Sequence, residues 1–595
     1  MKQTVNLTID GQAVEAKAGQ TILEAATAAG IKIPALCHHP ALKPIGACRM
    51  CLIEISKYQP LYPACTYEVS EGLAVTTRNE RIDQARRFVL HMLFSERNHY
   101  CMYCEMSGNC ELQDLGYEYG LDHWTYPTYT ERFPVDASRD TFLMDHNRCI
   151  LCRRCVRACS ELVANHTLGM RQRGAKTMIS ADLNLPFGDS SCVGCGTCLQ
   201  VCPTGALIDK RSAYLDMGHK VEIERVKSTC SQCSVGCGIE ILIRGGNVVR
   251  VDGDWDAKPN GGVLCQQGRF DPLYDKRSRI TMPMVRKNGT LQTADWETAL
   301  GTAARHLAEV PASQVGVVST SYATNEALYM VERLFGQKLG TDKIELLDAA
   351  LPRLPVRYAP LSQIAESDLL LVVGANPVED QPVASFLIKR AVDQGTRLIV
   401  VDGPHNPLIP FAHMNFEMAD LAEAAQVAAR AESPLVLYAT GVADAYLTQL
   451  QGLERAGFVA LEPGGNARGA AAYGLNGNAV GNEVEVLYVL LGEQVWGEAE
   501  TEKVAENAFL IVQTSYDSPL TQRAGVVLPA AIWSERSGML TNLEGRPCEA
   551  NQAVEPHGEA KADWEILGLL ADRLGHGPAV PLTELSALAA QGLKE

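Results

Sequence analysis

Cysteine is the residue with the most informative distribution in this 595-residue chain, because nineteen of its twenty cysteines lie within the first 265 positions. Together with His99, these nineteen divide into five groups of four side chains. Disulfide frameworks are typical of small secreted chains, whereas repeated C-x2-C pairs in a long chain indicate thiolates that bind metal. The first part of the chain is therefore predicted to hold five metal centres. Cys548, the remaining cysteine, is predicted to be a packed core thiol.

The first two groups lie within the first 110 residues. The first has the spacing C-x10-C-x2-C-x13-C, and its members are Cys37, Cys48, Cys51 and Cys65. The second joins one histidine to three cysteines, and its members are His99, Cys101, Cys104 and Cys110. Gly46 precedes Cys48 and allows the backbone to bend closely around a small metal cluster. Zinc stays open as an alternative for the first group, although zinc ribbons normally carry two tight cysteine pairs.

The third and fourth groups come from two runs with the spacing C-x2-C-x2-C-x3-C. One run holds Cys149, Cys152, Cys155 and Cys159, and the other holds Cys192, Cys195, Cys198 and Cys202. In bacterial ferredoxins the fourth cysteine of such a run binds the other cluster. One [4Fe–4S] cluster is therefore predicted on Cys149, Cys152, Cys155 and Cys202, and another on Cys159, Cys192, Cys195 and Cys198. Pro203, directly after the second run, completes the ferredoxin pattern.

Four arginines surround the first of these runs: Arg148, Arg153, Arg154 and Arg157. Their guanidinium groups could offset the negative charge of a cluster held by thiolates. They could equally form a charged face that is solvated by water. The sequence leaves both interpretations open.

The fifth group has the spacing C-x2-C-x3-C-x27-C, and its members are Cys230, Cys233, Cys237 and Cys265. Between its last two cysteines, the segment IEILIRGGNVVRVDGD alternates as two strands around a Gly-Gly turn. Near the first group, VNLTID and CLIEI predict strands and TILEAATAAG predicts a helix. These patterns predict small β-rich modules around the first and fifth groups. Zinc is again the alternative on spacing alone.

From about Asn288 onward, the chain alternates apolar strands with helices. The clearest strand candidates are Val315–Ser319, Asp368–Gly374, Arg397–Gly403 and Phe509–Ser515. Continuous β-branched runs of this kind indicate parallel strands that are covered on both faces, and Asn325–Leu339 is predicted to be a helix. The region is therefore predicted to be a doubly wound α/β domain. The glycine-rich segment Gly464–Gly474 does not match a dinucleotide fingerprint and is predicted to be a loop.

The bulk properties exclude several classes of partner. A net charge of −17 disfavours nucleic acid, because no basic surface would offset phosphate repulsion. No segment approaches the roughly 18 uncharged apolar residues that span a bilayer, and the N-terminal MKQTVNLTIDG lacks the layout of an export signal. We expect a cytoplasmic location, with peripheral attachment to the cytoplasmic face of a membrane complex left open. Because the chain lacks a dinucleotide fingerprint and a Walker loop, neither flavin nor NAD is expected on it.

The cysteine groups resemble those of known iron–sulfur redox families. The first group resembles the β-grasp [2Fe–2S] domain at the start of the large iron–sulfur subunit of complex I. The second resembles a [4Fe–4S] site of the same families with one histidine and three cysteines. Complex I subunits place that histidine where this chain has Arg97, and His99 matches the diaphorase subunits of NAD-linked nickel–iron hydrogenases better. The fifth group resembles the N-terminal [4Fe–4S] site of molybdopterin oxidoreductases.

The second half of the chain also resembles molybdopterin oxidoreductases, along GANPVEDQPVASFLIKRAVDQGTRLIVVDGPHNP and GVVLPAAIWSERSGMLTNLEGRPCEANQ. Two departures stand out. Active members carry a lysine where this chain has Gln267, and formate dehydrogenases carry a metal-binding cysteine in the region of Thr341–Arg357, where this chain has neither cysteine nor histidine. The resemblance therefore implies an inactive pterin domain without molybdopterin. A catalytic molybdenum- or tungsten-dependent, NAD-linked formate dehydrogenase alpha subunit is the alternative.

The resemblances together imply an electron-transfer subunit of a multi-subunit NAD(H)-linked oxidoreductase. Single electrons would pass through one [2Fe–2S] and four [4Fe–4S] clusters between a flavin and a second redox site, such as a quinone, hydrogenase or ferredoxin site. The implied partners are an NADH/FMN-binding iron–sulfur subunit, a small [2Fe–2S] subunit, and a further catalytic or membrane-associated subunit. No catalytic residue is expected on this chain itself. The parent complex stays open among complex I, hydrogenase, formate dehydrogenase and bifurcating enzymes.

The implied multidomain α+β and α/β architecture follows the cysteine groups along the chain. Residues 1–78 would form the [2Fe–2S] domain, 79–120 the [4Fe–4S] segment with one histidine and three cysteines, and 138–215 a two-cluster ferredoxin-like domain. Residues 220–285 would form a small β-rich [4Fe–4S] module, and 286–595 the doubly wound pterin-type domain.

Overall fold

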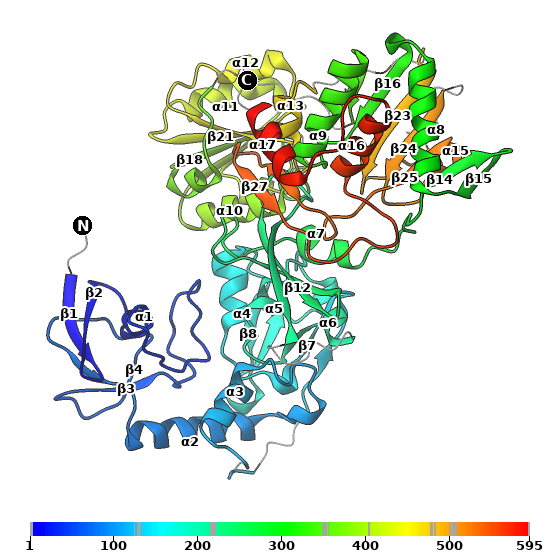
Figure 1. Cartoon of the computed structure of the whole chain (residues 1–595). Coiled ribbons are helices and arrows are strands. Elements are labelled where there is room, and N and C mark those ends of the chain that lie inside the picture. The colour runs from blue at the N-terminus through cyan, green and yellow to red at the C-terminus, as the bar shows by residue number, and fades with distance from the viewer. Residues whose placement is uncertain are drawn as a thin grey trace. The chain divides into compact units, whose positions relative to one another are not determined.

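Two compact units, Met1–Glu224 and Arg225–Glu595, make up the computed structural model of the chain (Figure 1). The structure describes residues 4–123, 125–127, 132–214, 222–347, 354, 356–402, 405–475, 480, 483–498, 501 and 508–592. The predicted domain ends at residues 1, 215, 220 and 595 lie outside the described residues. Within the described part of the chain, no helix has both the length and the apolar composition needed to span a bilayer.

The first unit begins with a mixed five-stranded sheet. In spatial order its strands are β2 (Gln12–Lys17), β1 (Thr4–Ile9), β5 (Ala74–Thr76), β3 (Leu52–Ile55) and β4 (Tyr62–Pro63). Every second residue of β1 is buried, and this period of two gives the sheet an apolar face. Helix α1 (Ile22–Ala28) packs against that face and begins with a capping box formed by Thr21 and Glu24. The strands and the helix predicted around the first cysteine group are confirmed.

Helix α2 (Glu80–Glu96) leads from this sheet to the second cysteine group, which is followed by α3 (Glu111–Glu118). The buried Arg86 of α2 donates to the carbonyl oxygens of Met50 and Leu52 at 3.0 and 2.8 Å. It also donates to the hydroxyl of Tyr119 at 3.0 Å. Because a buried charge is costly unless its donors are paired, these bonds fix α2 against both the first sheet and the end of α3.

The third part of the first unit carries the two cysteine runs. Its strands are β6 (Val135–Asp136), β7 (Phe142–Asp145) and β10 (Leu207–Asp209) in one sheet, and β8 (Leu168–Arg171) and β9 (Met178–Ala181) in another. Helix α4 (Arg154–Arg157) continues into the π-helical turn η3 (Ala158–Leu162), and α5 (Thr197–Gln200) lies within the second run and carries Cys198. Short helices with wide turns thus hold the cysteines, while the strands lie beside them.

The second unit begins with the antiparallel strands β11 (Glu224–Thr229), β12 (Gly238–Arg244) and β13 (Asn247–Gly253). Gly245 and Gly246 form the turn between β12 and β13 and have φ angles of +55° and +75°. Glycine adopts this left-handed conformation without steric cost. The hairpin predicted around the fifth cysteine group is confirmed.

The remainder of the second unit contains two large sheets and the two-stranded pair of β26 (Gly538–Thr541) and β27 (Pro547–Ala550), whereas the sequence predicted one doubly wound domain. The first is wholly parallel, in the order β20 (Met414–Phe416), β19 (Arg397–Val401), β18 (Leu369–Val373), β21 (Pro434–Ala439) and β22 (Gly457–Leu461). The second has the order β15 (Thr290–Thr293), β14 (Met284–Lys287), β25 (Val526–Pro529), β24 (Phe509–Thr514), β23 (Val486–Gly492), β16 (Val315–Ser319) and β17 (Ile344–Leu346). The predicted parallel α/β class is correct, but the strands form two separate cores.

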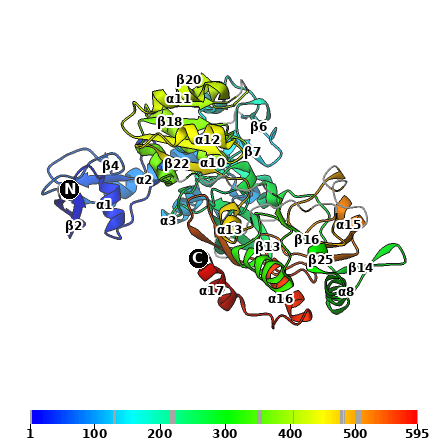
Figure 2. The same ribbon diagram turned by 90° about the horizontal axis from the view of Figure 1, so that it is seen from above.

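Each of these sheets has its own helices. Figure 2 shows α10 (Pro382–Asp393), α11 (Leu421–Ala428) and α12 (Asp444–Leu450) around the first sheet. Helices α8 (Trp296–Glu309) and α16 (Asp563–Arg573) lie beside the second (Figure 2). The predicted helix at 325–339 is present as α9 (Asn325–Val331) followed by the π-helical turn η9 (Glu332–Leu339).

Two expectations for the second unit are wrong. The segment predicted to be a loop, Gly464–Gly474, contains helix α13 (Ala467–Ala472), because its alanines favour a helix enough to offset one glycine. The packed core thiol predicted at Cys548 is instead half-buried on strand β27 (Pro547–Ala550), which is paired only with β26 (Gly538–Thr541).

Candidate metal centres

The four cysteines of the first group lie together at one edge of the first sheet. The backbone amides of Leu36 and Cys37 donate to the sulfur of Cys48 at 3.4 and 3.3 Å. Hydrogen bonds from the thiols of Cys48 and Cys65 lower the pKa of Cys37, and Cys65 bonds Cys51 in the same way. Gly46 has the predicted bend, with φ at +62°. All four sulfurs therefore belong to one contiguous, buried set.

The second group surrounds a cavity. The four predicted ligands His99, Cys101, Cys104 and Cys110 all line it. Nε2 of His99 is buried and has no hydrogen-bond partner among the residues that the structure describes, as expected for a nitrogen that faces a metal. Burial lowers the pKa of His99 to about 4, with further lowering by Arg148 and Arg97, so its imidazole is neutral at pH 7.

Gly205 forms part of the wall of this cavity, a role that no sequence pattern indicated. A Cβ at this position would lie 2.8 Å from the sulfur of Cys104, closer than real Cβ contacts allow. The backbone can approach the thiol this closely only because the residue is glycine. The position follows Pro203 by two residues, so the end of the second run also helps to build the site of the second group.

Arg97 occupies the position where complex I subunits carry their histidine, but its side chain makes structural contacts instead of lining the cavity. It is buried, donates 2.6 Å to the carbonyl oxygen of His146 and also donates to the carbonyl oxygen of Thr177. Its guanidinium stacks 4.1 Å from the ring centroid of Phe133. Arg97 thus attaches the end of α2 to the ferredoxin-like part, while His99 lines the cavity.

The fourth cysteine of each run lies beside the other run. Phe142 and Phe187 help to line one cavity, together with Cys159, Cys192, Cys195 and Cys198. In the other set, burial raises the pKa values of Cys149, Cys152 and Cys155, and the nearby Cys202 raises each of them further. The side chains that the structure brings together are therefore those that the crossed assignment pairs.

The two runs also repeat the same backbone conformation. Leu151 and Arg153 have φ angles of +54° and +59°, and Gly194 and Gly196, at the equivalent positions of the second run, have +66° and +68°. In each run, the first of these residues donates its amide to the sulfur two positions earlier, at 3.4 Å in the first run and 3.5 Å in the second. The second run thus uses glycine where the first run holds larger residues in a disfavoured conformation.

The arginines around the first run were predicted either to offset the charge of a cluster or to form a solvated face, and the structure distinguishes between them. Arg153 is exposed, as expected of a solvated face. Arg154 and Arg157 are only 3% and 5% exposed. Arg154 forms a bidentate ion pair with Glu111 at 2.7 and 2.9 Å, and Arg157 donates to the carbonyl oxygens of Cys37 and Lys43. Arg157 therefore links the turn that carries Cys155 and Cys159 to the first cysteine group.

The fifth group lies in the second unit, at the base of the β12–β13 hairpin. The amide of Cys230 donates 2.8 Å to the carbonyl oxygen of Cys237. Burial raises the pKa values of Cys230, Cys233 and Cys237, and Cys265 adds to the rise in each case. A Cβ on Gly268 would lie 3.1 Å from the sulfur of Cys230 and 3.8 Å from that of Cys265. The four thiols therefore form one compact set.

These donor sets fit iron–sulfur clusters. Among the described residues, no three histidine, cysteine, aspartate or glutamate side chains converge closely enough to hold a single metal ion. The side chains of two groups instead line cavities. Backbone amides donate to the sulfurs of Cys48, Cys149 and Cys192, and such bonds tune cluster potentials. In the fifth group burial raises the pKa of every thiol, so binding of a cluster there would release protons.

Three of the cysteine groups share one apolar core. A single cluster of buried side chains contains Cys37 of the first group, Cys110 of the second and Cys152 of the third, packed with Leu36, Met50, Leu90, Phe94, Leu112, Leu115, Tyr119 and Ile150. A continuous packed core of this kind excludes water and fixes the three groups relative to one another. The first unit therefore packs one ligand of each of these three groups into a single apolar core.

The structure describes one of the two positions at which the chain differs from active molybdopterin oxidoreductases, and part of the other. Gln267 follows Cys265 by two residues, and its side-chain amide donates 3.1 Å to the carbonyl oxygen of Glu379. Of the segment Thr341–Arg357, which lacks cysteine and histidine, residues 348–353 and 355 lie outside the described residues.

Family models match the chain along most of its length. The first unit matches a 2Fe-2S iron-sulfur cluster binding domain at residues 2–80, an NADH-ubiquinone oxidoreductase-G iron-sulfur binding region at 86–124 and a 4Fe-4S dicluster domain at 148–206. The second unit matches a Molybdopterin oxidoreductase Fe4S4 domain at 223–272 and a Molybdopterin oxidoreductase at 279–447 and 449–573. Binding domains for both [2Fe–2S] and [4Fe–4S] clusters are therefore present.

Known proteins resemble the chain over long stretches. An NADH-quinone oxidoreductase subunit of Rhizobium meliloti is 33% identical over 410 residues, which cover 67% of this chain and 48% of that protein. NADH-quinone oxidoreductase subunit 3 of Thermus thermophilus is 29% identical over 664 residues, covering 96% of this chain and 83% of that protein. A chain of the solved NAD+-reducing [NiFe]-hydrogenase is 36% identical over 35% of this chain and 87% of its own length, with a TM-score of 0.33. The chain thus spans about half the length of the Rhizobium relative.

Proposed function

Since the chain belongs to the family of large iron–sulfur subunits of NADH-quinone oxidoreductases, we propose that it relays single electrons within a multi-subunit NAD(H)-linked oxidoreductase. The observation that carries this proposal is the shared apolar core of Cys37, Cys110 and Cys152. Electron transfer between clusters falls steeply with distance, so a relay requires ligands of neighbouring clusters to be packed together. A dry core also suppresses side reactions of reduced clusters with water and oxygen.

The proposed relay consists of one [2Fe–2S] and four [4Fe–4S] clusters. The [2Fe–2S] ligands are Cys37, Cys48, Cys51 and Cys65. The ligands of the four [4Fe–4S] clusters are His99 with Cys101, Cys104 and Cys110; Cys149, Cys152, Cys155 and Cys202; Cys159, Cys192, Cys195 and Cys198; and Cys230, Cys233, Cys237 and Cys265. The five predicted domains follow the same order along the chain.

The chemistry at both ends of the relay belongs to partners. We place an NADH/FMN-binding iron–sulfur subunit and a small [2Fe–2S] subunit on the input side, and a catalytic or membrane-associated subunit on the output side. The complex would work in the cytoplasm or at the cytoplasmic face of a membrane. No substrate-converting site is assigned to this chain.

A polar cavity in the second unit supports this assignment of the chemistry to partners. It lies where β23 and β24 end, and the carboxyl ends of parallel strands are the usual ligand site of such sheets. Its two arginines are each paired with a carboxylate: Arg536 bonds Glu493 at 3.3 Å and Asp563 at 2.6 Å, and Arg277 bonds Asp275 at 2.6 Å. Arginines that are already paired with carboxylates are not free to bind the charge of a substrate.

Reduction by NADH tests the relay directly. We expect dithionite to reduce the clusters of the isolated chain, whereas NADH reduces them only after the flavin-bearing partner is added, because the proposal assigns the nicotinamide site to that partner. Electron paramagnetic resonance (EPR) spectra of both mixtures give the readout. Reduction of the isolated chain by NADH, or no reduction in the assembled complex, would contradict the proposed role.

The match to molybdopterin oxidoreductases supports a second candidate function, that of a molybdenum- or tungsten-dependent formate dehydrogenase subunit. Metal analysis separates the two functions. We expect about 18 iron atoms per chain from the five clusters, without stoichiometric molybdenum or tungsten in either the natural chain or a Gln267→Lys variant. One molybdenum or tungsten per chain would favour the second candidate.

Arg157 is expected to set the potential of the [2Fe–2S] cluster. Its guanidinium is buried and donates to the carbonyl oxygen of Cys37, so an Arg157→Gln variant removes a positive charge beside an anionic cluster. We expect the midpoint potential to fall by on the order of 50 mV. A redox titration followed by EPR measures it, and Arg153→Gln, an exposed arginine of the same turn, is the matched control. Equal shifts in both variants would contradict a specific role for Arg157.

A further inference from the structure

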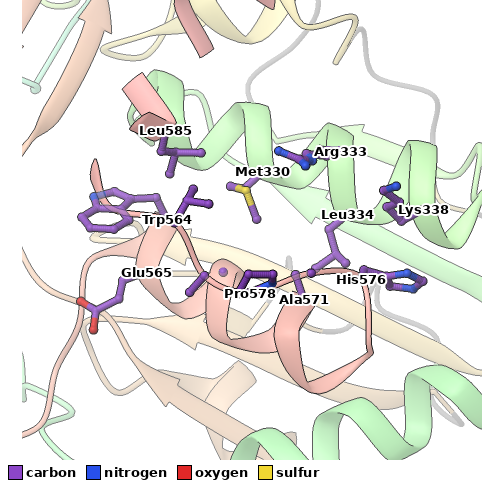
Figure 3. Close-up of a pocket in the computed structure, with 14 residues that line it drawn as sticks. Met330, Arg333, Leu334, Lys338, Trp564, Glu565, Ala571, His576, Pro578 and Leu585 are labelled. Carbon is purple, nitrogen blue, oxygen red and sulfur yellow. The ribbon is translucent and has the colours of Figure 1, made fainter. Parts of the chain in front are cut away.

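A second pocket, unrelated to the cysteine groups, opens in the second unit (Figure 3). It lies between the π-helical turn η9, helix α16, the segment 576–580 and helix α17 (Leu582–Gly592). Its volume is about 170 Å³, and a cavity of about 150 Å³ is known to hold benzene. The pocket therefore has room for one six-membered ring or a short branched chain.

One end of the pocket is apolar. Trp564, Leu585 and Met330 gather there in Figure 3, and Pro578 lies between them and the opposite end. The indole of Trp564 is held in place, because its Nε1 donates 3.1 Å to the carbonyl oxygen of Ser537. A fixed indole beside small side chains makes a flat, preformed surface, which suits an aromatic ring.

The other end carries nitrogen donors. Figure 3 places Lys338 and His576 on the side away from Trp564, with Arg333 above the pocket. In the described part of the chain, neither Arg333 nor Lys338 forms an ion pair, and Arg333 only stacks 5.9 Å from the ring centroid of Tyr329. Both cations therefore remain available to an anion.

The single carboxylate among the lining residues does not compete for these cations. Glu565 lies at the opposite end from Lys338 and His576 (Figure 3) and pairs with Lys561 at 2.8 Å. In the polar cavity at β23 and β24, by contrast, the two lining arginines, Arg277 and Arg536, are paired with carboxylates. Here Arg333 and Lys338 stand beside the pocket, and the one carboxylate that lines it is paired with Lys561.

The backbone around the cations is also unusual. Arg333 and Lys338 lie on η9, where helix α9 widens into π-helical hydrogen bonding. π-helical turns are rare, and they occur frequently at functional sites. The wider turn lets residues five apart line the same pocket.

We propose that this pocket binds a small aromatic carboxylic acid. The ring would lie against Trp564, Met330 and Leu585, and the carboxylate would accept hydrogen bonds from Arg333 and Lys338. This division follows the usual design of small-molecule sites, which are apolar pockets with a few polar groups that fix orientation. The proposal does not depend on the electron-relay function.

Calorimetric titration of the full cluster-loaded chain with phenylacetate tests the proposal. We expect saturable one-to-one binding with a Kd of about 1 mM or below. Phenylacetamide, which keeps the ring and removes the charge, should bind at least about tenfold more weakly. The same loss is expected for phenylacetate binding to an Arg333→Gln, Lys338→Gln double variant.

Two controls keep the outcome decisive. A Lys287→Gln, Arg305→Gln double variant removes two exposed cations from the same unit outside the pocket and should bind phenylacetate like the natural chain. Iron content must be unchanged in both double variants, which shows that they are folded. Absence of saturable binding, equal affinity for the acid and the amide, or equal affinity in the natural chain and the Arg333→Gln, Lys338→Gln variant would overturn the proposal.

Discussion

An alanine at Cys159 is expected to remove the cluster of the second cysteine run and to leave the cluster of the first run intact. Cys159 belongs to the first run in sequence, but it lines the same cavity as Cys192, Cys195 and Cys198. Iron content should fall by about four atoms from about 18 per chain. Because one missing thiolate leaves an iron without its protein ligand, we expect complete loss of that cluster.

Double variants identify which cluster has been lost. If Cys159 and Cys195 hold the same cluster, the double variant Cys159→Ala, Cys195→Ala loses no more iron than either single variant. Cys159→Ala combined with Cys152→Ala should lose about eight iron atoms, because two clusters are then disrupted. The reverse pattern would contradict the crossed assignment, and Cys202→Ala should give the mirror-image result.

A cysteine at position 99 is expected to retain a four-iron cluster and to lower its midpoint potential by on the order of 100 mV. Thiolate is anionic where imidazole is neutral, so the exchange makes the cluster harder to reduce. The buried, unpartnered Nε2 of His99 and its position on the cavity wall support direct ligation. A redox titration monitored by EPR gives the potential.

The control for this exchange is His123→Cys, which places a cysteine at an exposed histidine of the same region. It should leave all potentials unchanged. An unchanged potential in His99→Cys would show that His99 does not bind the cluster. His99→Ala is expected to lose the cluster or to bind it with a weak external ligand, visible as a reduced EPR signal.

The cavity lined by Cys159, Cys192, Cys195 and Cys198 brings together residues that the sequence already groups by the ferredoxin pattern, in which the fourth cysteine of one run joins the other run. Binding of a cluster by each set remains a prediction. The number of sheets could not be predicted. Strands such as Leu369–Val373 and Phe509–Thr514 look alike in sequence, and only long-range pairing assigns them to different cores.

Burial of charge could not be predicted from the sequence either. Arg153, Arg154 and Arg157 stand within five residues, yet one is exposed and two are buried. What separates them is the position of Glu111 and of the Cys37 carbonyl, which lie far away along the chain. The π-helical turns at Ala158–Leu162 and Glu332–Leu339 have no simple sequence signal, because their composition suits an ordinary helix.

The repeated loop conformation of the two cysteine runs has a consequence for durability. Leu151 and Arg153 each hold a left-handed backbone conformation at a cost of about 1 kcal/mol, whereas Gly194 and Gly196 hold it freely. A bound cluster would hold both loops in the same conformation. If the cluster were lost, the loop of the first run would lower its free energy by relaxing, whereas the loop of the second run would not. The two cysteine runs would therefore differ after cluster loss. The first run would bind a new cluster less readily than the second, because its loop must return to the disfavoured conformation.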